Sequence, residues 1–225
     1  MPPSPHGLPG RFVVIEGVDG CGSTTHTKRL TKALREMDID ARLTCEPSTG
    51  PIGGTIRQIL QNRLVVADRS GPRPFDWATM GLLFAADRLD HLDSEVLPGL
   101  EAGKVVVSDR YDLSSLAYQS VTAKDATSVV PWIRELNRRA IRPDLTIVMD
   151  VPAAVARERR ESRGGDEEIY DSRDLQERLV AVYARAEDLI PGDRVVHIAG
   201  DAGVGDVAAR VLDAVREILP DTTDS

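Results

Sequence analysis

The segment Phe12–His26 has the sequence FVVIEGVDGCGSTTH, in which an apolar run passes into a glycine-rich turn. Gly17, Gly22 and Thr24 fit the phosphate-binding pattern GxxxxGK(S/T), but Ser23 stands where the pattern has lysine. Glycines suit such a loop because a chain that wraps a polyphosphate must turn tightly and bring its N–H groups close to the oxygens. The segment therefore predicts a strand, a P-loop without its positive charge, and a helix.

This loop is expected to bind a polyphosphate together with Mg²⁺. The helix after it would direct its positive end at the anion, and the Thr24 hydroxyl would bind the metal. The missing lysine would normally neutralise the β and γ phosphate oxygens during phosphoryl transfer. Taken alone, the segment is equally compatible with an ordinary strand-to-helix turn, so other parts of the chain must separate the two interpretations.

The composition indicates one globular domain. The chain has 225 residues, of which 41% are hydrophobic and 28% charged, as is ordinary for a single α/β domain. Its net charge of −8 argues against a general nucleic-acid binder, because such proteins need a basic face. We expect residues 11–219 to form the domain, with flexible tails at 1–10 and 220–225.

The sequence carries no signal for a membrane or for export. No apolar run approaches the roughly 18 residues of a membrane helix, and the first ten residues lack the basic start and apolar centre of a signal peptide. Cys21 and Cys45 are too few for a disulfide framework and lack metal-ligand spacing. Free thiols in a reducing cytoplasm are therefore expected.

Apolar runs alternate with helical patterns along the chain, a rhythm typical of βα units around a mostly parallel sheet. Strands are expected at Phe12–Glu16, Ala41–Cys45, Lys104–Ser108, Leu145–Asp150 and Arg194–Ala199. Helices are expected at Thr24–Met37, Gly53–Gln61, Asp76–Leu97, Leu113–Val121, Ala126–Arg139, Pro152–Arg160, Asp174–Leu189 and Val204–Leu219. The last helix should bury a stripe made of Val204, Val207, Val211, Val215 and Ile218.

Ligands of an open parallel sheet bind beyond the carboxyl ends of its strands. Asp109 and Arg110 follow directly on one of the expected strands. The carboxylate would hold magnesium through water, and the guanidinium would bind a phosphate. An exposed Asp–Arg ion pair is the alternative interpretation of these two residues.

Five segments, in order, resemble motifs of the thymidylate kinase family, the nucleoside monophosphate kinases that convert dTMP to dTDP. They are EGVDGCGSTT (16–25), CEPSTGPIGGTIR (45–57), LLFAADRLDHL (82–92), SDRYDLSSLAYQ (108–119) and RPDLTIVMDVPAAVARERRESRG (142–164). They are similar to the family's P-loop, its REP segment, its LLFxADR helix, its DRYxxSxxAYQ stretch, and its RPDLTxxLDV strand with the lid that follows. The resemblance runs from Phe12 to about Leu219.

The resemblance implies a P-loop NTPase-type three-layer α/β/α fold, with a five-stranded parallel sheet of order 2-3-1-4-5 and a short arginine-rich lid at about 157–172. It also implies ATP and Mg²⁺ as cofactors. The residues that it assigns to the ATP-binding loop are Gly17, Gly20, Cys21, Gly22, Ser23, Thr24 and Thr25, with Thr24 and Asp109 at the magnesium. Those that it assigns to the acceptor nucleotide are Asp19, Glu46, Phe84, Arg88, Arg110, Ser115, Tyr118 and Gln119.

Within the acceptor set, the resemblance implies separate tasks. Phe84 would stack on thymine, and Arg88, four residues further along one helix face, would hydrogen-bond the base. Ser115 or Gln119 would complete the reading of the base, and Tyr118 would crowd the 2′ position and so favour deoxyribose. Without the family, Phe84 would be interpreted as a core residue and Tyr118 as an ordinary helix residue.

Catalysis would rest on Asp19, Asp109, Arg110 and two lid arginines, Arg160 and Arg163. Some members of the family carry a transition-state arginine in the P-loop, and others carry it in the lid. This P-loop contains none, so the lid would supply it. An arginine-rich helix end is otherwise a solvated face that complements the helix dipole.

Two positions depart from the family pattern, and both remove positive charge. Ser23 replaces the P-loop lysine, and Cys45 stands where many bacterial members have the arginine of REP. Loss of the lysine would slow phosphoryl transfer by about 10² to 10⁴ while backbone amides and magnesium still bind substrate. Lys28 should not replace it, because five residues along a helix is roughly 7.5 Å and 140° away. Ser23 is either natural or introduced by substitution.

The predicted function is ATP- and Mg²⁺-dependent phosphorylation of dTMP to dTDP. The alternatives are a kinase of a related or modified pyrimidine nucleotide, a catalytically weak relative whose nucleotide-bound state signals to a partner, and, more remotely, a P-loop protein outside nucleotide metabolism. The family usually forms dimers, so the resemblance also implies a homodimer. The expected partners are the small nucleotides ATP and dTMP, with no nucleic acid and no membrane.

Overall fold

A computed structural model describes residues 4–123, 126–164, 169–170 and 172–219. Within these residues, five strands form one parallel sheet in the order β2-β3-β1-β4-β5, which confirms the expected order. The strands are β1 (Arg11–Glu16), β2 (Ala41–Cys45), β3 (Val105–Asp109), β4 (Leu145–Asp150) and β5 (Val195–Ala199). Each lies within one residue of its predicted bounds.

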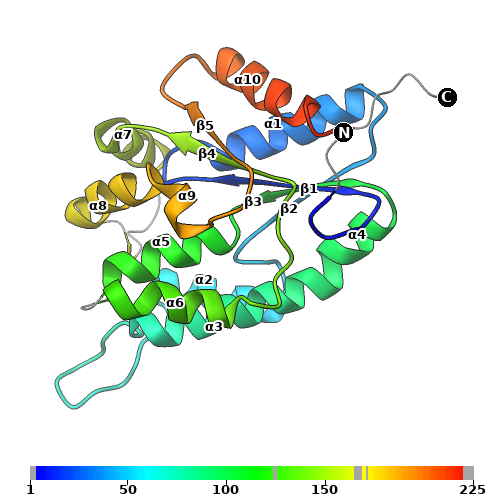
Figure 1. Ribbon diagram of the computed structural model, residues 1–225. Helices are drawn as coiled ribbons and strands as arrows, with labels where there is room; N and C mark the ends of the chain where they lie inside the picture. The colour runs from blue at the N-terminus through cyan, green and yellow to red at the C-terminus, as the bar shows by residue number, and fades with distance from the viewer. Residues whose placement is uncertain (1–3, 124–125, 165–168, 171, 220–225) are drawn as a thin grey trace.

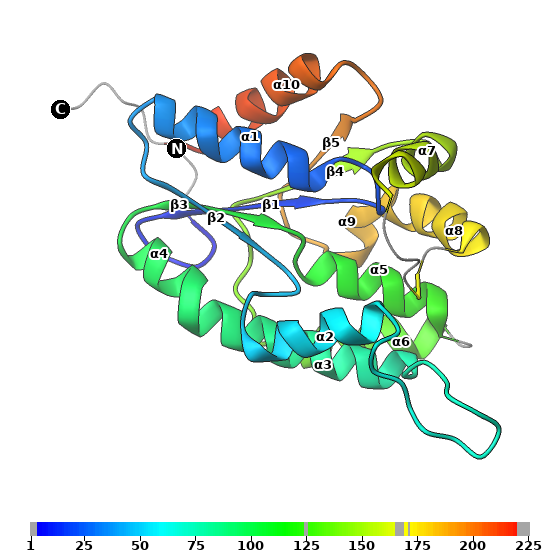
Figure 2. The ribbon, with the colours of Figure 1, turned by 180° about the vertical axis from the view of Figure 1, so that it is seen from behind.

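Helices cover both faces of the sheet and confirm the three-layer α/β/α architecture (Figure 1). On one face α1 (Ser23–Glu36) and α10 (Val204–Arg216) pack side by side. The other face carries α5 (Asp112–Thr122) and α8 (Arg173–Tyr183), and beyond α5 lie α2 (Pro51–Leu60), α3 (Trp77–His91) and α6 (Ala126–Leu136) (Figure 2). In the described part of the chain, no helix is both long and apolar enough to cross a membrane.

Two of the expected helices are divided in the structure. The helix predicted over Asp76–Leu97 is a regular α-helix only as far as His91. From there the helical path continues through a π-helical turn, η1 (Leu92–Val96), into α4 (Leu97–Glu101). Pro98 does not stop it, because proline is tolerated in a first helical turn. The helix predicted over 174–189 is broken at Arg185, which separates α8 from α9 (Ala186–Leu189).

The sheet is covered by apolar side chains on both faces. The predicted stripe is correct for Val207, Val211 and Val215 on α10 and for Ile218 just after its end, each at most 2% exposed. Val204 is 45% exposed, and its prediction is wrong, because it is the first residue of α10 and precedes the part that packs on the body.

The segment before β1 also needs a correction. Residues 1–10 were expected to form a free tail, but residues 4–10 lie against the body of the protein. His6 Nε2 is 2.9 Å from Asp144 Oδ2, and the Gly10 amide donates to the carbonyl oxygen of Leu100 at 2.9 Å. Leu8 packs against the apolar cluster that contains Phe12. Residues 1–3 and 220–225 lie outside the described ranges.

The strand register brings the functional segments to one edge of the sheet. Ile15 and Cys45 both pair with Asp109, from opposite sides of β3, and Glu16 pairs with Val148. The glycine-rich loop and the residues that follow β2 and β3 therefore converge, as parallel strands require.

Candidate active site

The glycine-rich loop connects β1 to α1, as its pattern predicted. Gly17, Gly20 and Gly22 have φ values of 150°, 89° and 101°, which residues with side chains rarely adopt. A Cβ at Gly20 would lie 2.2 Å from the carbonyl oxygen of Ala156 in α7 (Ala153–Arg163), so only glycine fits this contact. α1 begins at Ser23 without a side-chain cap from the preceding residue, which leaves the N–H groups of its first turn for an anion.

The remaining loop residues differ in exposure. Cys21 and Ser23 are buried, whereas Thr24 and Thr25 are exposed on the first turn of α1. Burial raises the pKa of the Cys21 thiol to about 11, so the thiol stays protonated at neutral pH. The loop therefore offers backbone amides and hydroxyl groups, but no charged side chain between Gly20 and Thr25.

Thr24 and Asp109 form the candidate metal pair. Thr24 Oγ1 donates to Asp109 Oδ2 at 2.5 Å, and Asp109 Oδ1 is buried with no hydrogen-bond partner among the described residues. A free carboxylate oxygen beside a hydroxyl suits Mg²⁺, which binds through one or two carboxylates, waters and phosphates. No cluster of three or more His, Cys, Asp or Glu side chains suited to a metal occurs in the described ranges. The residues thus fit a metal shared with a phosphorylated ligand.

Arg110 joins the end of β3 to the P-loop. Its Nη2 lies 2.5 Å from Asp19 Oδ1, and its Nη1 donates to the Gly17 carbonyl oxygen at 2.9 Å. Tyr118 donates its hydroxyl to the other Asp19 oxygen at 2.7 Å. Desolvation alone would raise the pKa of Asp19, but Arg110, Tyr118 and Arg160 outweigh it and lower that pKa, which keeps the carboxyl ionised.

The backbone of Arg110 is unusual. Its φ of 73° lies in the left-handed region, which costs a residue with a side chain about 1 to 2 kcal/mol. Its amide donates to the Ile15 carbonyl oxygen at 3.0 Å. Such strain is typical of functional sites whose surroundings hold the residue in place.

Two arginines of α7 contact the P-loop backbone. Arg160 Nη1 donates to the Asp19 carbonyl oxygen at 2.6 Å. Arg159, another arginine of the predicted lid, donates to the carbonyl oxygens of Cys21 at 3.3 Å and Gly200 at 3.0 Å. The structure therefore places cations at the loop in spite of Ser23. The side chain of Arg163 and much of the predicted lid, residues 165–168 and 171, lie outside the described residues.

All the residues proposed for the acceptor nucleotide line one cavity of about 190 Å³ beside the P-loop. They come from five places: the P-loop (Asp19), the segment after β2 (Glu46), α3 (Phe84, Arg88), the end of β3 (Arg110) and α5 (Ser115, Tyr118, Gln119). The sequence separates them by up to about a hundred positions, and the fold brings them together. Their individual roles stay predictions.

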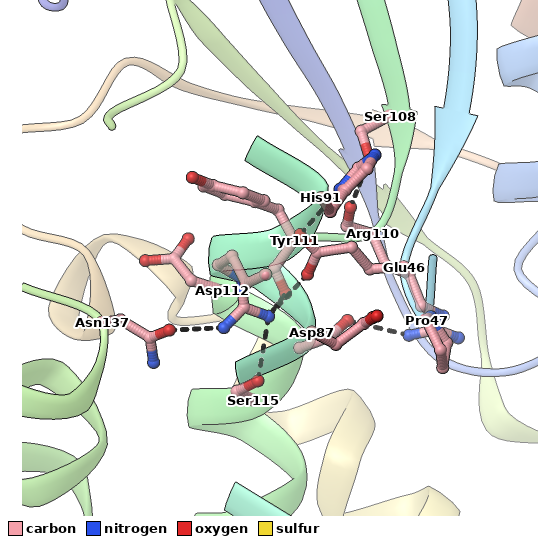
Figure 3. Close-up of polar contacts among 12 residues, drawn as sticks. Glu46, Pro47, Asp87, His91, Ser108, Arg110, Tyr111, Asp112, Ser115 and Asn137 are labelled. Carbon is pink, nitrogen blue, oxygen red and sulfur yellow. Dashed lines mark hydrogen bonds and ion pairs between the residues drawn. The ribbon is translucent and has the colours of Figure 1, made fainter. Parts of the chain in front are cut away.

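Arg88 is the most enclosed charged group of this cavity, with 1% of its surface exposed. Nη1 donates to Asn137 Oδ1 at 2.5 Å, and Nη2 contacts Glu46 Oε2 at 2.7 Å (Figure 3). Nη2 also donates to the Tyr111 carbonyl oxygen at 3.0 Å and to Ser115 Oγ at 3.1 Å. These contacts fix the plane of the guanidinium.

Three polar atoms of the acceptor cavity are left over. Arg88 Nε and both amide atoms of Gln119 are buried without a hydrogen-bond partner in the described part of the chain. Buried polar groups are nearly always paired, so this exception indicates a ligand that offers both donors and acceptors. The edge of a nucleobase has that character.

Sequence reasoning missed several groups at the site. Arg57 lines the same cavity and donates to the carbonyl oxygens of Pro47 at 2.9 Å and Ser48 at 2.6 Å. It ends the segment CEPSTGPIGGTIR, so this cation was present in a motif already recognised. Tyr170 also lines the cavity, and its ring centroid is 5.1 Å from that of Tyr118.

Glu16 is a further missed residue, and it is fully buried. Its Oε1 accepts from the amides of Tyr111 at 2.8 Å and Ser114 at 3.2 Å, and its Oε2 accepts from the Ser114 hydroxyl at 2.5 Å. Burial raises the pKa of Glu16 to about 7, against the opposing effect of Arg110. In the sequence, a glutamate at the end of an apolar strand does not indicate that its carboxyl group will be buried and accept these three hydrogen bonds.

A P-loop at the head of a parallel sheet of order 2-3-1-4-5, with a second ligand cavity beside it, defines a P-loop kinase of nucleotides. The family model for thymidylate kinase matches residues 15–208. The chain is 36% identical to a probable thymidylate kinase of Pyrococcus abyssi, covering 84% of this chain and 88% of that protein. It is 32% identical to a thymidylate kinase of Nitrosomonas europaea, covering 96% and 97%. The chain belongs to the thymidylate kinase family.

Proposed function

We propose that this protein transfers the γ-phosphoryl group of ATP to dTMP and so forms dTDP. The observation that carries the proposal is the acceptor cavity, which contains polar atoms without a hydrogen-bond partner among the described residues. The P-loop lies beside this cavity and is joined to it by the Asp19–Arg110 ion pair. Two phosphorylated nucleotides could thus meet end to end. Direct in-line transfer needs no covalent enzyme intermediate.

In the acceptor cavity, the base would lie between Phe84 and the polar edge formed by Arg88 and Gln119. Gln119 can donate and accept at once, as the pyrimidine edge of thymine requires. The Tyr118 hydroxyl already donates to Asp19, and this hydrogen bond holds the ring where the sugar would lie. This supports deoxyribose over ribose.

The phosphate of dTMP would meet Arg57 and Arg110, the two other arginines of the cavity. Planar guanidinium groups bind phosphate oxygens bidentately and stay charged at all working pH values. Arg110 would have to exchange part of its contact with Asp19 for the phosphate, and Arg160 would steady the migrating group from the side of α7.

ATP would lie with its phosphates on the amides of Gly17–Thr25 and the N-terminus of α1. Mg²⁺ would be held by Thr24 and Asp109, where it would offset the charge of the β and γ phosphates. Arg159 would flank the loop between Cys21 and Gly200. The positive charge that Ser23 lacks would come in part from these α7 arginines, so turnover would be slow rather than absent.

The proposal is tested by coupled ADP release with a panel of nucleoside monophosphates, comparing the unsubstituted chain with Ser23→Lys. We expect dTMP to be the best acceptor and the lysine to raise kcat by about 10² or more. A modified pyrimidine nucleotide that outperforms dTMP would support the first alternative. Binding of dTMP in calorimetry without turnover by either form would contradict the kinase assignment and support a nucleotide-binding relative.

We further propose a homodimer that buries the outer face of α3. Leu82 is 52% and Leu89 40% exposed, and these residues lie seven positions, or two helical turns, apart on α3. Exposed apolar side chains on one helix face are typical of an interface. Light scattering should show a dimer that becomes a monomer in the double variant Leu82→Glu, Leu89→Glu.

We place the activity in the cytoplasm. Cys21 and Cys45 are both free thiols in the structure, as a reducing compartment maintains them. Fractionation of cells that express the protein would test this location.

A further inference from the structure

His91 lies one turn after Arg88 and does not line the acceptor cavity. It is the last residue of α3, and none of its surface is exposed. Its Nδ1 is 3.2 Å from Glu46 Oε1 (Figure 3). Its Nε2 is 2.5 Å from Thr44 Oγ1. Glu46 reaches Arg88 through its other oxygen. The four residues thus form a chain of contacts that ends at the cavity.

The protons available for the hydrogen bonds among these four residues can be counted. Thr44 has one hydroxyl proton and donates it to Glu95 Oε2 at 3.0 Å, so its oxygen can only accept from His91 Nε2–H. Glu46, ionised in its salt bridge with Arg88, can likewise only accept from His91 Nδ1–H. With these donors, all of the contacts are satisfied when both ring nitrogens of His91 carry a proton.

A doubly protonated His91 would face a carboxylate on its Nδ1 side. Glu46 then lies between two cations, Arg88 and His91. Glu95 accepts the hydrogen bond from the Thr44 hydroxyl, and its Oε2 lies 3.3 Å from Arg42 Nη2. Two carboxylates and three cations are then present, so the group carries one excess positive charge, but Arg88 and His91 both contact Glu46 and neither is buried without an opposite charge.

We propose that His91, as an imidazolium, is a positioning residue for the acceptor site. It holds the Glu46 carboxylate from behind, and Glu46 then holds Arg88 Nη2, so that the unpartnered Nε stays available to the acceptor base. Without the contact from His91, the carboxylate can rotate and the guanidinium loses one of the partners that fix its plane. The proposal rests on the proposed function for the identity of the acceptor, but its proton count does not.

A matched pair of substitutions separates the two ring nitrogens. In His91→Asn the side-chain amide can replace Nδ1–H toward Glu46, and in His91→Gln it can replace Nε2–H toward Thr44. We expect His91→Asn to keep the KM for dTMP within a few-fold, and His91→Gln to raise it about ten- to hundredfold, the effect of losing a hydrogen bond to a charged group. The KM for ATP should stay unchanged in both, because the P-loop is built from other elements.

A second measurement does not depend on activity. With ¹⁵N-histidine labelling at pH 7, the two His91 ring nitrogens, assigned by their disappearance in His91→Asn, should both show the shift of a protonated nitrogen. A lone-pair shift at Nδ1 would overturn the proposal whatever the KM values of the two variants. Equal KM values for dTMP in the two variants, or a parallel rise in the KM for ATP, would also overturn it. If the natural chain does not use dTMP, the proposed function fails while the NMR result still decides the state of His91.

Discussion

Arg110 and Asp19 form an ion pair of 2.5 Å that joins the end of β3 to the P-loop. It lies between the acceptor cavity and the phosphate-binding loop, and Tyr118 and Arg160 contact Asp19 from two further elements. Groups from α5, α7 and the end of β3 therefore meet at Asp19, through its carboxylate and its backbone carbonyl. These contacts make the effects of single substitutions specific enough to predict.

Tyr118→Phe should affect catalysis through Asp19. The ring stays, but the 2.7 Å hydrogen bond that lowers the pKa of Asp19 is lost, so that pKa rises. We expect kcat to fall about tenfold and the acid limb of the pH profile of kcat/KM to move to higher pH. Rates measured over a pH range that extends below 3.8, the ordinary pKa of aspartate, check this. An acid limb that stays in place would show that Asp19 titration does not control the rate.

Asp109→Asn should raise the magnesium requirement. The variant keeps the volume of the side chain but removes the charge and one oxygen beside Thr24, so we expect kcat to fall by about 10² or more. The folded state should not be weakened, because the unpartnered buried oxygen Oδ1 costs stability. Rate against Mg²⁺ concentration is the measurement.

The control for this prediction is Asp93→Asn, which changes an exposed carboxylate in η1. It should leave the Mg²⁺ dependence unchanged. An identical Mg²⁺ dependence in Asp109→Asn would remove Asp109 from the metal site.

Gly20→Ala should abolish nucleotide binding. Its Cβ would lie 2.2 Å from the Ala156 carbonyl oxygen at a φ of 89°, so the loop or α7 must shift. Gly54→Ala in α2 is the matched control, because nothing lies within 4 Å of its Cβ. The control should gain about 0.5 to 1 kcal/mol of unfolding free energy. Calorimetry with ATP and urea unfolding distinguish the two, and normal ATP binding by Gly20→Ala would contradict the tight contact.

Glu16→Gln should change how stability depends on pH. The folded pKa of about 7 lies above the ordinary 4.5, so the folded state binds the proton more tightly than the unfolded state. The stabilisation is complete below pH 4.5 and is lost as pH rises through 7. The natural chain should lose up to about 3 kcal/mol relative to the glutamine variant between those limits.

Urea unfolding of both proteins at pH 5, 6, 7 and 8 provides the test of the Glu16 prediction. The difference in unfolding free energy should move in favour of Glu16→Gln as the pH rises. A flat difference, or one of opposite slope, would mean that Glu16 is ionised in the folded protein throughout this range.

Much of the fold could be predicted from local patterns. The strands were placed within a residue because buried parallel strands are continuous β-branched runs. The breaks at His91 and Arg185 were missed, since neither has a proline or glycine to mark it. Leu8 and His6 do not lie in a free tail, because Leu8 packs against an apolar cluster and His6 contacts Asp144. A short polar stretch of sequence does not indicate such contacts with distant residues.

The sequence by itself determined the family, through five motifs in order, and the resemblance to that family implied the strand order and the residues proposed for the acceptor. The tertiary structure alone decided which of them are paired and which are left for a ligand. Glu16, Arg57 and His91 entered the site only there. Their effect depends on burial and on partners from other elements, and no local pattern encodes the orientation of a donor toward an acceptor that the fold brings from a distant part of the chain.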